Sequence, residues 1–277
     1  GLWFERDLRR ADVVLATKHS GEGLQIVRDG APISAATIAE TVEGSLRRLK
    51  TDYIDLYQFH WPNRGSYMFR KNWTFDPSGQ NRADTLAHME EALDALQTQV
   101  KRGTIRAFGL SNESAWGTSQ WLAAAERTGG PRVVSIQNEY SLMCRMYDTD
   151  LAELSVNEDV GLLAFSPLAT GLLTGKYQKG QIPEKSRLSL NPDLGGRKTD
   201  RAFEAVDLYL AIAKKHDLDP TQMALAWCLT RPFMGSVIFG ARTMDQLKTA
   251  LASVEVTLSD EVLTELDAAH RACPMPY

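Results

Sequence analysis

Short apolar runs rich in β-branched residues alternate along this chain with segments of helical periodicity. When a helix connects two strands of one sheet by a right-handed crossover, the two strands are parallel. The alternation therefore predicts an α/β fold on a parallel sheet, in a single domain over residues 1–277 because no linker interrupts the pattern. The six predicted strands are residues 13–18, 53–60, 105–110, 133–138, 160–165 and 236–240.

The segments between these strands repeat apolar residues at spacings of three and four, which places them on one face of a helix. Ser34 is suited to cap the first helix, over residues 34–49, because its hydroxyl can accept a hydrogen bond from the first turn. Gly103 follows the next helix, over residues 86–100, where a left-handed residue would end it. Further helices are predicted over residues 115–127, 149–157, 199–216, 220–229, 244–251 and 260–270.

Composition and charge narrow the functional classes. A chain of 277 residues, 43% hydrophobic and 24% charged, can bury a core. Its net charge of −4 offers no attraction to nucleic acid or to an anionic membrane, and no apolar stretch reaches the roughly 18 residues of a membrane span. The three cysteines form no CxxC pair, which indicates reduced thiols in a cytoplasmic protein. No metal site is expected, because His88, His216 and His270 have no partner at ligand spacing.

Two longer irregular stretches, residues 61–82 and 175–198, interrupt the alternation. Loops that follow strand ends commonly carry binding residues, so both stretches are candidates for contacting a substrate or a cofactor. The first contains Trp61 and Trp73, aromatic side chains of the kind that line hydrophobic substrate pockets.

Two of the predicted strands end in side chains capable of acid–base chemistry. Lys18 ends the first strand and His60 the second, and in a barrel enzyme several strand ends of this kind face one mouth. Each residue also has an ordinary interpretation, the lysine as a solvated strand end and the histidine as a core residue. A doubly wound dinucleotide-binding sheet would require G-x-G-x-x-G after its first strand, and residues 18–23 lack the third glycine.

Six groups of motifs occur in the order that is typical of aldo-keto reductases, and they cover essentially the whole chain. They are residues 14–18, 55–62, 109–112, 137–140, 165–168 with 174–177, and 240–247. The chain thus resembles that family, whose fold is a (β/α)8 TIM barrel. By this resemblance the six strands correspond to the third through eighth of the barrel. The first two β/α units, which carry the family's catalytic aspartate and tyrosine, are absent from this sequence.

The resemblance implies catalytic roles for Lys18 and His60. In the family a lysine lowers the pKa of the acidic tyrosine, as Lys18 would, and a histidine orients and polarises the carbonyl, as His60 would. Hydride transfer to a carbonyl develops alkoxide charge, so the site needs a proton donor and a positive environment. Tyr53, Tyr57 and Tyr140 belong to other elements and are not expected to replace the family's tyrosine.

The resemblance also implies that NADPH is the cofactor. Ser111, Asn112 and Gln137 resemble the groups that hold the nicotinamide carboxamide, since amide recognition needs both donors and acceptors. Phe165 resembles the ring that stacks on the nicotinamide, and Arg242, at the predicted start of a helix, suits a phosphate. The other implied cofactor residues are Ser166, Pro167, Leu168 and Ala169 along the pyrophosphate, Lys176 and Arg187 at phosphates, and Gly240 and Gln246 beside Arg242.

The resemblance therefore implies an NADPH-dependent oxidoreductase that reduces aldehydes or ketones to alcohols, with a small carbonyl compound as its partner. Because the aspartate and tyrosine segment is absent, this chain alone is expected to turn over poorly. Two alternatives stay open. One is a non-catalytic NADPH-binding or scaffold protein derived from such a reductase, and the other is an aldolase that forms a Schiff base on Lys18.

Overall fold

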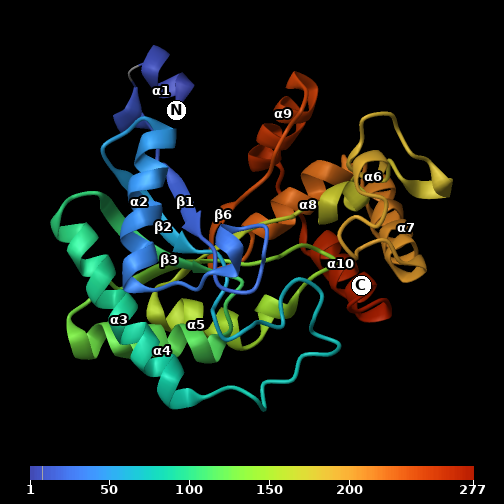
Figure 1. The fold of residues 1–277 in the computed structure, drawn as a ribbon. Coiled ribbons are helices and arrows are strands. Elements are labelled where there is room, and N and C mark those ends of the chain that lie inside the picture. The colour runs from blue at the N-terminus through green and yellow to red at the C-terminus, as the bar shows by residue number, and fades with distance from the viewer. Residues whose placement is uncertain (8) are drawn as a thin grey trace. The chain divides into compact units, whose positions relative to one another are not determined.

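The structure is a computed structural model that describes residues 1–7 and 9–277 (Figure 1). Its contacts define two compact units: the first contains Gly1–Gln137 and Glu158–Val160, the second Asn138–Asn157 and Gly161–Tyr277. Six parallel strands follow one another in the sheet in chain order, as predicted. This α/β arrangement is consistent with the predicted barrel type, and the described residues show no strand pairing that closes the sheet.

The first unit holds four neighbouring strands whose carboxyl ends align. Lys18 lies opposite Gln58, Gln58 lies opposite Gly109, and Ser111 lies opposite Gln137. Because these strands are parallel, the residues that follow them meet at one edge of the sheet. The strands are β1 (Ala16–His19), β2 (Ile54–Phe59), β3 (Ile105–Ser111) and β4 (Val133–Gln137).

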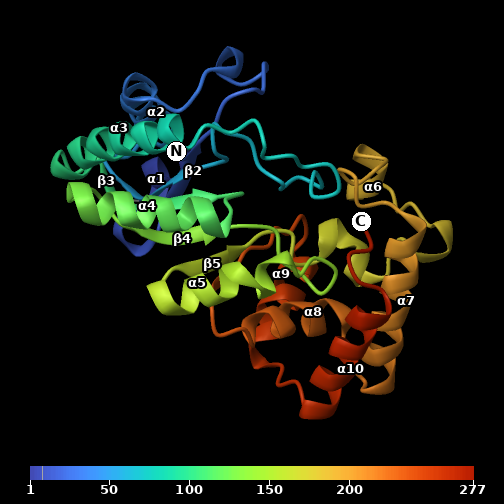
Figure 2. The same cartoon turned by 90° about the horizontal axis from the view of Figure 1, so that it is seen from below.

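Three helices of the first unit pack against these strands. Phe59, Phe108 and Trp121 are buried at the centre of the layer, with ring centroids 4.9 to 5.6 Å apart. Burial of a side chain such as phenylalanine contributes about 1.5–3 kcal/mol, so this cluster helps to fix α4 on the sheet. Figure 2 shows α3 and α4 side by side. The helices are α2 (Ala35–Leu49), α3 (Arg82–Lys101) and α4 (Ala115–Thr128).

The ends of these helices follow from local sequence. The hydroxyl of Ser34 accepts a hydrogen bond from the Thr37 amide, so α2 begins as predicted. Gly103 has φ +73° just after α3, a backbone conformation that favours glycine. Ser114 caps α4 by accepting a hydrogen bond from the Gly117 amide at 3.1 Å, and this cap holds the start of α4 directly after β3.

The second unit packs helices against two short parallel strands. Trp227 is fully buried and stacks on Tyr140 with ring centroids 5.3 Å apart. Helix α8 is apolar almost all round, which fits its burial, and α7 and α10 lie side by side in Figure 2. The elements are β5 (Gly161–Ala164), β6 (Met234–Val237), α7 (Asp200–Lys215), α8 (Pro220–Leu229), α9 (Met244–Leu251) and α10 (Asp260–Ala272), with α5 (Asp150–Glu158) ending in the first unit.

The predicted helices all occur, although α3 begins four residues earlier than predicted. The predicted strand 236–240 is wrong, because β6 spans Met234–Val237. The Leu162 amide donates to the Phe233 carbonyl, so pairing with β5 begins just before Gly235. Glycine is rare in strands and therefore weakens a strand prediction at this position.

No helix among the described residues is long and apolar enough to cross a membrane. Two short helices were not predicted: α1 (Leu2–Asp7) and α6 (Arg187–Leu190).

Candidate functional site

Four predicted site residues lie at the carboxyl ends of successive strands in the first unit. Side chains alternate between the faces of a strand, and the register places Lys18, His60, Ser111 and Gln137 on one face. The His60 amide donates to the carbonyl of His19 at 2.8 Å, which extends the pairing of β1 and β2 to this point. The structure therefore brings together the residues that the sequence placed on four separate strands.

Lys18 and His60 influence each other electrostatically. Both side chains are half-buried, and burial lowers the pKa of Lys18 from its usual 10.5. Burial, assisted by the positive charge of Lys18, lowers the pKa of His60 to about 4. At neutral pH the pair thus consists of a neutral imidazole beside an ammonium group that gives up its proton more readily than an exposed lysine does.

Asn112 follows β3 in a left-handed backbone conformation, with φ +52°. Its side chain is only 1% exposed, and the amide nitrogen Nδ2 donates to the His60 carbonyl at 2.9 Å and to Ser111 Oγ at 3.1 Å. The side-chain oxygen Oδ1 is buried and has no hydrogen-bond partner among the described residues. A buried acceptor in this state costs about 1–3 kcal/mol, so it marks a place where a donor would bind favourably.

The backbone around Asn112 is fixed by its neighbours. Ser111 Oγ donates to the Gln137 carbonyl at 2.7 Å, and the Asn112 amide donates to the same oxygen at 3.1 Å. The side chain of Gln137 is half-buried at this edge. All three residues predicted to hold an amide group therefore belong to one bonded cluster at the ends of β3 and β4.

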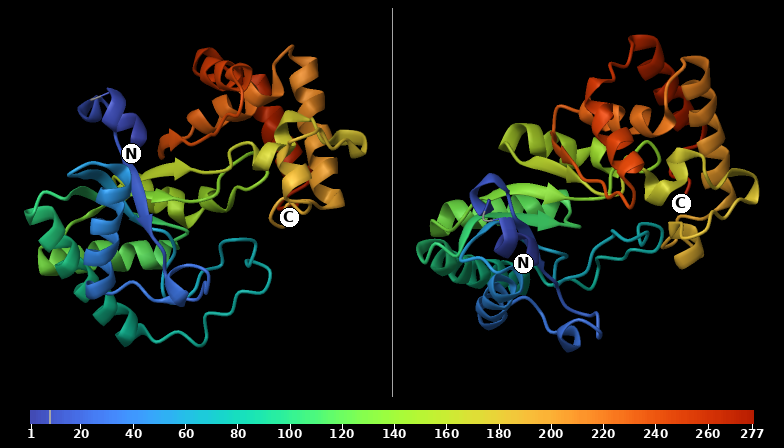
Figure 3. Two further views of the ribbon diagram at one scale, coloured as in Figure 1. Left: turned by 45° about the horizontal axis from the view of Figure 1, so that its top comes forward. Right: turned by 90° about the horizontal axis from the view of Figure 1, so that it is seen from above.

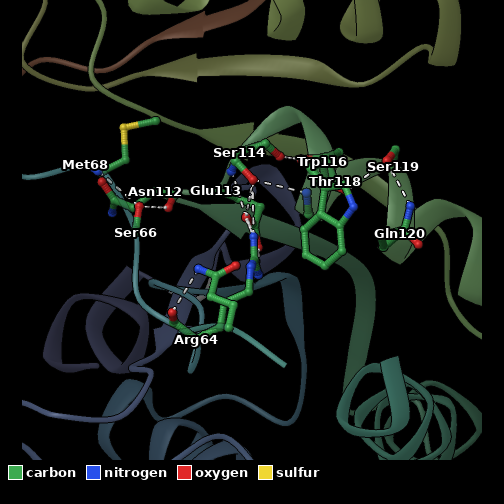
Figure 4. A network of polar contacts seen from close by, with 12 residues as sticks. Arg64, Ser66, Met68, Asn112, Glu113, Ser114, Trp116, Thr118, Ser119 and Gln120 are labelled. Atoms are coloured by element: carbon green, nitrogen blue, oxygen red, sulfur yellow. Dashed lines mark hydrogen bonds and ion pairs between the residues drawn. The ribbon is translucent and has the colours of Figure 1, made fainter. Parts of the chain in front are cut away.

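The loop between β2 and α3 can be followed as a ribbon in Figure 3, and Figure 4 shows that its residues brace this cluster. Ser66 Oγ donates to the Asn112 carbonyl at 2.8 Å. Arg64 forms a two-pronged ion pair with the buried carboxylate of Glu113, and Gln80 Nε2 donates to the Arg64 carbonyl at 3.1 Å. These partners could not be predicted from the sequence, because each pair joins residues far apart in the chain. A glutamate directly before the capping residue Ser114 was the one local signal.

Two of the tyrosines named above use their hydroxyl groups within their own unit. The hydroxyl of Tyr57, in β2, bonds to Thr41 of α2 at 2.6 Å on the helix-covered side. Burial raises the pKa of Tyr57 well above its usual value. In the second unit, burial and the charge of Asp148, which accepts a hydrogen bond from Tyr140, raise the pKa of Tyr140. Neither phenol is suited to donate a proton to a substrate.

A cavity of about 1150 Å³ lies between the β2–α3 loop and the ends of α2 and α3. Trp61 lines it, and its ring packs against His60 with centroids 4.6 Å apart. Phe69 lines the cavity as well and meets Trp61 edge to face. The other predicted aromatic, Trp73, is 65% exposed and lines no described cavity. Of the two tryptophans, only Trp61 is thus placed to shape a pocket near His60.

In the second unit the predicted stacking residue follows β5. Phe165 is half-buried and forms a bridge with Glu139, in which its amide donates to the Asn138 carbonyl at 3.0 Å. The chain then turns sharply, with left-handed φ angles at Ser166 (+54°) and Ala169 (+47°). The other two predicted residues of this turn are Pro167, which is buried, and Leu168, which is half-buried.

The predicted phosphate residues of the second unit lie on its surface. Arg242 is exposed and precedes α9, and its guanidinium donates to the Lys185 carbonyl in the loop 175–198. The Gln246 side chain accepts a hydrogen bond from the Arg242 amide at 2.9 Å. The two segments that carry predicted phosphate contacts are thus in contact with each other. The remaining predicted residues here are Gly240 and Arg187, both exposed, and Lys176, which is half-buried over the ring of Tyr177.

A buried ion pair in the second unit was also missed. Glu139 accepts two hydrogen bonds of 2.7 Å from Arg197, and both side chains are 6% exposed. The hydroxyl of Tyr277 donates to the same carboxylate at 3.3 Å. Because Glu139 also bridges to Phe165, this pair supports the strand end that carries the predicted stacking ring.

One cluster of metal-ligand type lies elsewhere in the second unit. His216 Nε2 is 3.1 Å from a carboxylate oxygen of Glu265, and Glu261 is adjacent. These partners are not at ligand spacing in the sequence, because α10 brings the glutamates from a distant part of the chain. The ammonium of Lys215 already pairs with both carboxylates.

The sequence matches the Aldo/keto reductase family over residues 1–271. This chain belongs to the aldo/keto reductase family. The aldo/keto reductase described here is 40% identical over 282 residues to Protein tas of Escherichia coli, with 100% of this chain and 80% of that protein covered. It is 39% identical over 249 residues to an aldo-keto reductase of Babesia bovis, covering 85% and 87%. It is 32% identical over 272 residues to the uncharacterized oxidoreductase YrpG of Bacillus subtilis, covering 96% and 75%.

Membership of the family makes this aldo/keto reductase an oxidoreductase, which confirms the reaction class expected from its motifs. The individual catalytic and cofactor residues stay predictions. Within each unit the structure shows what those residues contact.

Proposed function

We propose that this protein reduces the carbonyl group of a small aldehyde or ketone with NADPH. NADPH supplies a hydride, which forms a C–H bond at the carbonyl carbon while the oxygen takes up a proton, giving the alcohol and NADP⁺. The acidic net charge of −4 supports a small molecule rather than a nucleic acid as the substrate. The compartment that suits such a reductase, whose cysteines are buried thiols and not disulfides, is the cytoplasm.

The single observation that carries the proposal is the unpaired Oδ1 of Asn112. This acceptor is buried in a cluster whose other hydrogen-bonding groups point inward to protein partners. A primary amide, with its two N–H donors and one acceptor, is the chemical group that such a site fits. The nicotinamide carboxamide has this chemistry, so Asn112 would accept from its nitrogen, with Ser111 and Gln137 alongside.

Lys18 and His60 would handle the proton and the charge on the substrate oxygen. With a pKa of about 4, His60 is neutral at pH 7 and can donate a hydrogen bond but gives up its ring proton poorly. Lys18, whose pKa burial lowers, stabilises negative charge on the oxygen and is the better proton source of the two. The Tyr57 hydroxyl takes no part in this, because it bonds to Thr41 on the opposite side of β2.

Arg242 would bind a phosphate and so favour NADPH over NADH. Its side chain is exposed, it precedes the start of α9, and a guanidinium offers five N–H donors, of which Nη1 bonds to Lys185. Guanidinium groups bind phosphates through paired hydrogen bonds. Lys176 and Arg187 would add positive charge, and Phe165 would stack on the nicotinamide.

The first test is NADPH binding by fluorescence titration, with the variant Asn112→Gly. Glycine keeps the left-handed backbone but removes the amide oxygen. We expect binding to weaken about tenfold, the value of roughly 1.4 kcal/mol for one hydrogen bond in a buried site. The matched control is Asp217→Gly, an exposed residue with φ +52°, which should leave the affinity unchanged.

The second stage adds an aldehyde and follows NADPH oxidation at 340 nm. Oxidation that depends on aldehyde supports the reductase, whereas binding without oxidation would support a non-catalytic NADPH-binding protein. Reduction with borohydride distinguishes the aldolase alternative, because it would attach a carbonyl substrate to Lys18 in the absence of NADPH. If Asn112→Gly binds NADPH as tightly as the unaltered protein does, the main support for the proposed cofactor site is removed.

A further inference from the structure

We propose that the β2–α3 loop sets the cofactor recognition of Asn112 through two attachments, Ser66 and the Arg64–Glu113 ion pair. Neither attachment touches the reacting atoms, so these are positioning residues. The inference rests on the proposed function, because it concerns how the nicotinamide carboxamide is recognised. All of the residues involved belong to the first unit (Figure 4).

The attachment through Ser66 acts on the backbone of Asn112. Ser66 Oγ donates to the Asn112 carbonyl at 2.8 Å and accepts from the Met68 amide at 3.1 Å, so both functions of the hydroxyl are used. The Asn112 peptide lies at φ +52°, a conformation that asparagine adopts more readily than most residues but that is still uncommon. A hydrogen bond that holds the carbonyl therefore selects the rotation of this peptide.

The side chain of Asn112 depends on that rotation. Its Nδ2 donates to both the His60 carbonyl and Ser111 Oγ, and the two hydrogen bonds together hold the orientation of the Cα–Cβ bond. With Nδ2 held in this way, Oδ1 has a fixed direction, and Oδ1 is the atom left to accept a hydrogen bond from a ligand. The hydrogen bond from Ser66 to the Asn112 carbonyl thus influences the direction of Oδ1, because both oxygens belong to the same residue.

The Arg64–Glu113 pair fixes the loop to the residue after Asn112. Arg64 Nη1 donates to Glu113 Oε2 at 3.0 Å, Nη2 donates to Oε1 of the same carboxylate, and Nη2 also donates to Ser114 Oγ at 3.2 Å. The Glu113 side chain is 2% exposed and also accepts from the Ser114 amide at 2.7 Å. A carboxylate at the start of α4 is favoured by the helix dipole, and the paired geometry gives the contact directional strength.

Gly117 makes room for this ion pair. A Cβ atom at position 117 would collide with Arg64 Nη2 and with Glu113 Oε1. In the interior of a helix, alanine is otherwise favoured over glycine by about 1 kcal/mol. A glycine in the first turn of α4 is thus explained by the contact with the loop and not by the helix.

The test compares the binding of NADPH with that of its 3-acetylpyridine analogue, in which a methyl group replaces the amide nitrogen. The unaltered protein should prefer NADPH by about tenfold, because only the amide donates to Asn112 Oδ1. In Ser66→Ala and Arg64→Met this preference should fall to about twofold or less, mainly through weaker binding of NADPH. The controls are Ser78→Ala in the same loop and Arg127→Met, whose exposed partner is Glu90.

Gly117→Ala provides a variant that keeps both charged residues. It should lower the preference as Arg64→Met does, although alanine favours the helix. If Arg64→Met does not fold, Ser66→Ala and Gly117→Ala decide the outcome, with thermal unfolding as the check on folding.

Two results would overturn the inference alone. One is an equal loss of affinity for both nucleotides, which indicates a merely structural role, and the other is an unchanged preference in Ser66→Ala and Gly117→Ala. If the unaltered protein binds neither nucleotide, or binds both equally, the proposed cofactor site itself fails, and the inference fails with it.

Discussion

The predicted site residues of the two units differ in how far the protein fixes them in advance. In the first unit Ser111 and Asn112 are 2% and 1% exposed, and each is held by several hydrogen bonds. In the second unit Arg242 and Arg187 are exposed, and Arg242 is joined to the rest of its unit by contacts at the surface. The first group holds its hydrogen-bonding atoms in fixed directions, whereas the second group offers positive charge at the surface.

This difference has a physical reason. Hydride transfer requires the reacting groups to be held in a narrow range of distances and angles, which rigid, buried hydrogen bonds provide. A phosphate needs positive charge nearby but tolerates variation in position. Exposed charges act in water, and salt weakens them over a distance of about 10 Å at 0.1 M. The two groups should therefore respond differently to substitution, pH and salt.

The largest expected effect is on the rate in Lys18→Met. Removal of the proposed proton source should lower the rate of NADPH oxidation with an aldehyde by about 10²–10⁴-fold, while the dissociation constant for NADPH changes by less than about threefold. Steady-state rates and fluorescence titration measure the two quantities. Arg242→Met is the comparison from the second unit, and it should change the affinity and not the rate at saturation. An equal loss of rate in both variants would contradict the proposed difference between the residues of the two units.

The next effect concerns stability in acid. Burial lowers the pKa of His19 to about 4, and its ring bonds to Ser20 and Thr37. Because the folded pKa lies below the unfolded value of 6.5, this histidine contributes stability above pH 6.5 that is lost as the pH falls toward 4. The full loss is on the order of 3 kcal/mol. Chemical denaturation between pH 7 and 4 should show it as a falling midpoint.

His19→Gln tests the source of this pH dependence. Glutamine keeps hydrogen-bonding capacity but does not titrate, so the variant should be less stable at pH 7 and should approach the unaltered protein near pH 4. His60, with a pKa also lowered to about 4, and His88, whose pKa burial lowers as well, contribute in the same direction and should leave part of the slope in the variant. A difference between the two proteins that is constant with pH would rule out His19 as the source.

The smallest expected effect is the salt response of cofactor binding. Arg242→Gln should weaken NADPH binding about tenfold at low ionic strength, and the loss should shrink as salt screens the exposed charge. Affinity for NADH, which lacks the extra phosphate, should barely change. The loss in Asn112→Gly should be independent of salt, because that contact is buried and uncharged. Titrations at 20 mM and about 500 mM NaCl separate the two behaviours.

Much of the fold could be predicted because its signals are local. The cap at Ser34 and the left-handed Gly103 are properties of a few consecutive residues. The misplaced strand β6 shows the limit of such signals. Gly235, inside this strand, has no strand preference of its own, and the strand forms because β5 lies beside it. The placement of Lys18 and His60 at one edge of the sheet also follows from a local fact, the end of each apolar run, combined with parallel pairing.

The residues that escaped prediction have partners far away in the chain. Arg64 meets Glu113 across 49 positions, Arg197 meets Glu139 across 58, and His216 meets Glu265 across 49. No pattern in the sequence selects one such partner among many charged residues. The glycine at position 117 is visible in the sequence, but only the packed ion pair explains it.

The attachment points of the β2–α3 loop bear on how this protein could evolve. Ser66 is tied to Asn112 near the beginning of the loop, and Gln80 is tied to the Arg64 carbonyl near its end. The chain between these two contacts forms a loop whose ends are held together. Doubling the length of such a loop costs only about 0.6 kcal/mol of closure free energy. Insertions and substitutions between residues 69 and 79 can therefore reshape the cavity wall without moving Asn112. New substrate preferences can arise there while the machinery at the strand ends is inherited unchanged.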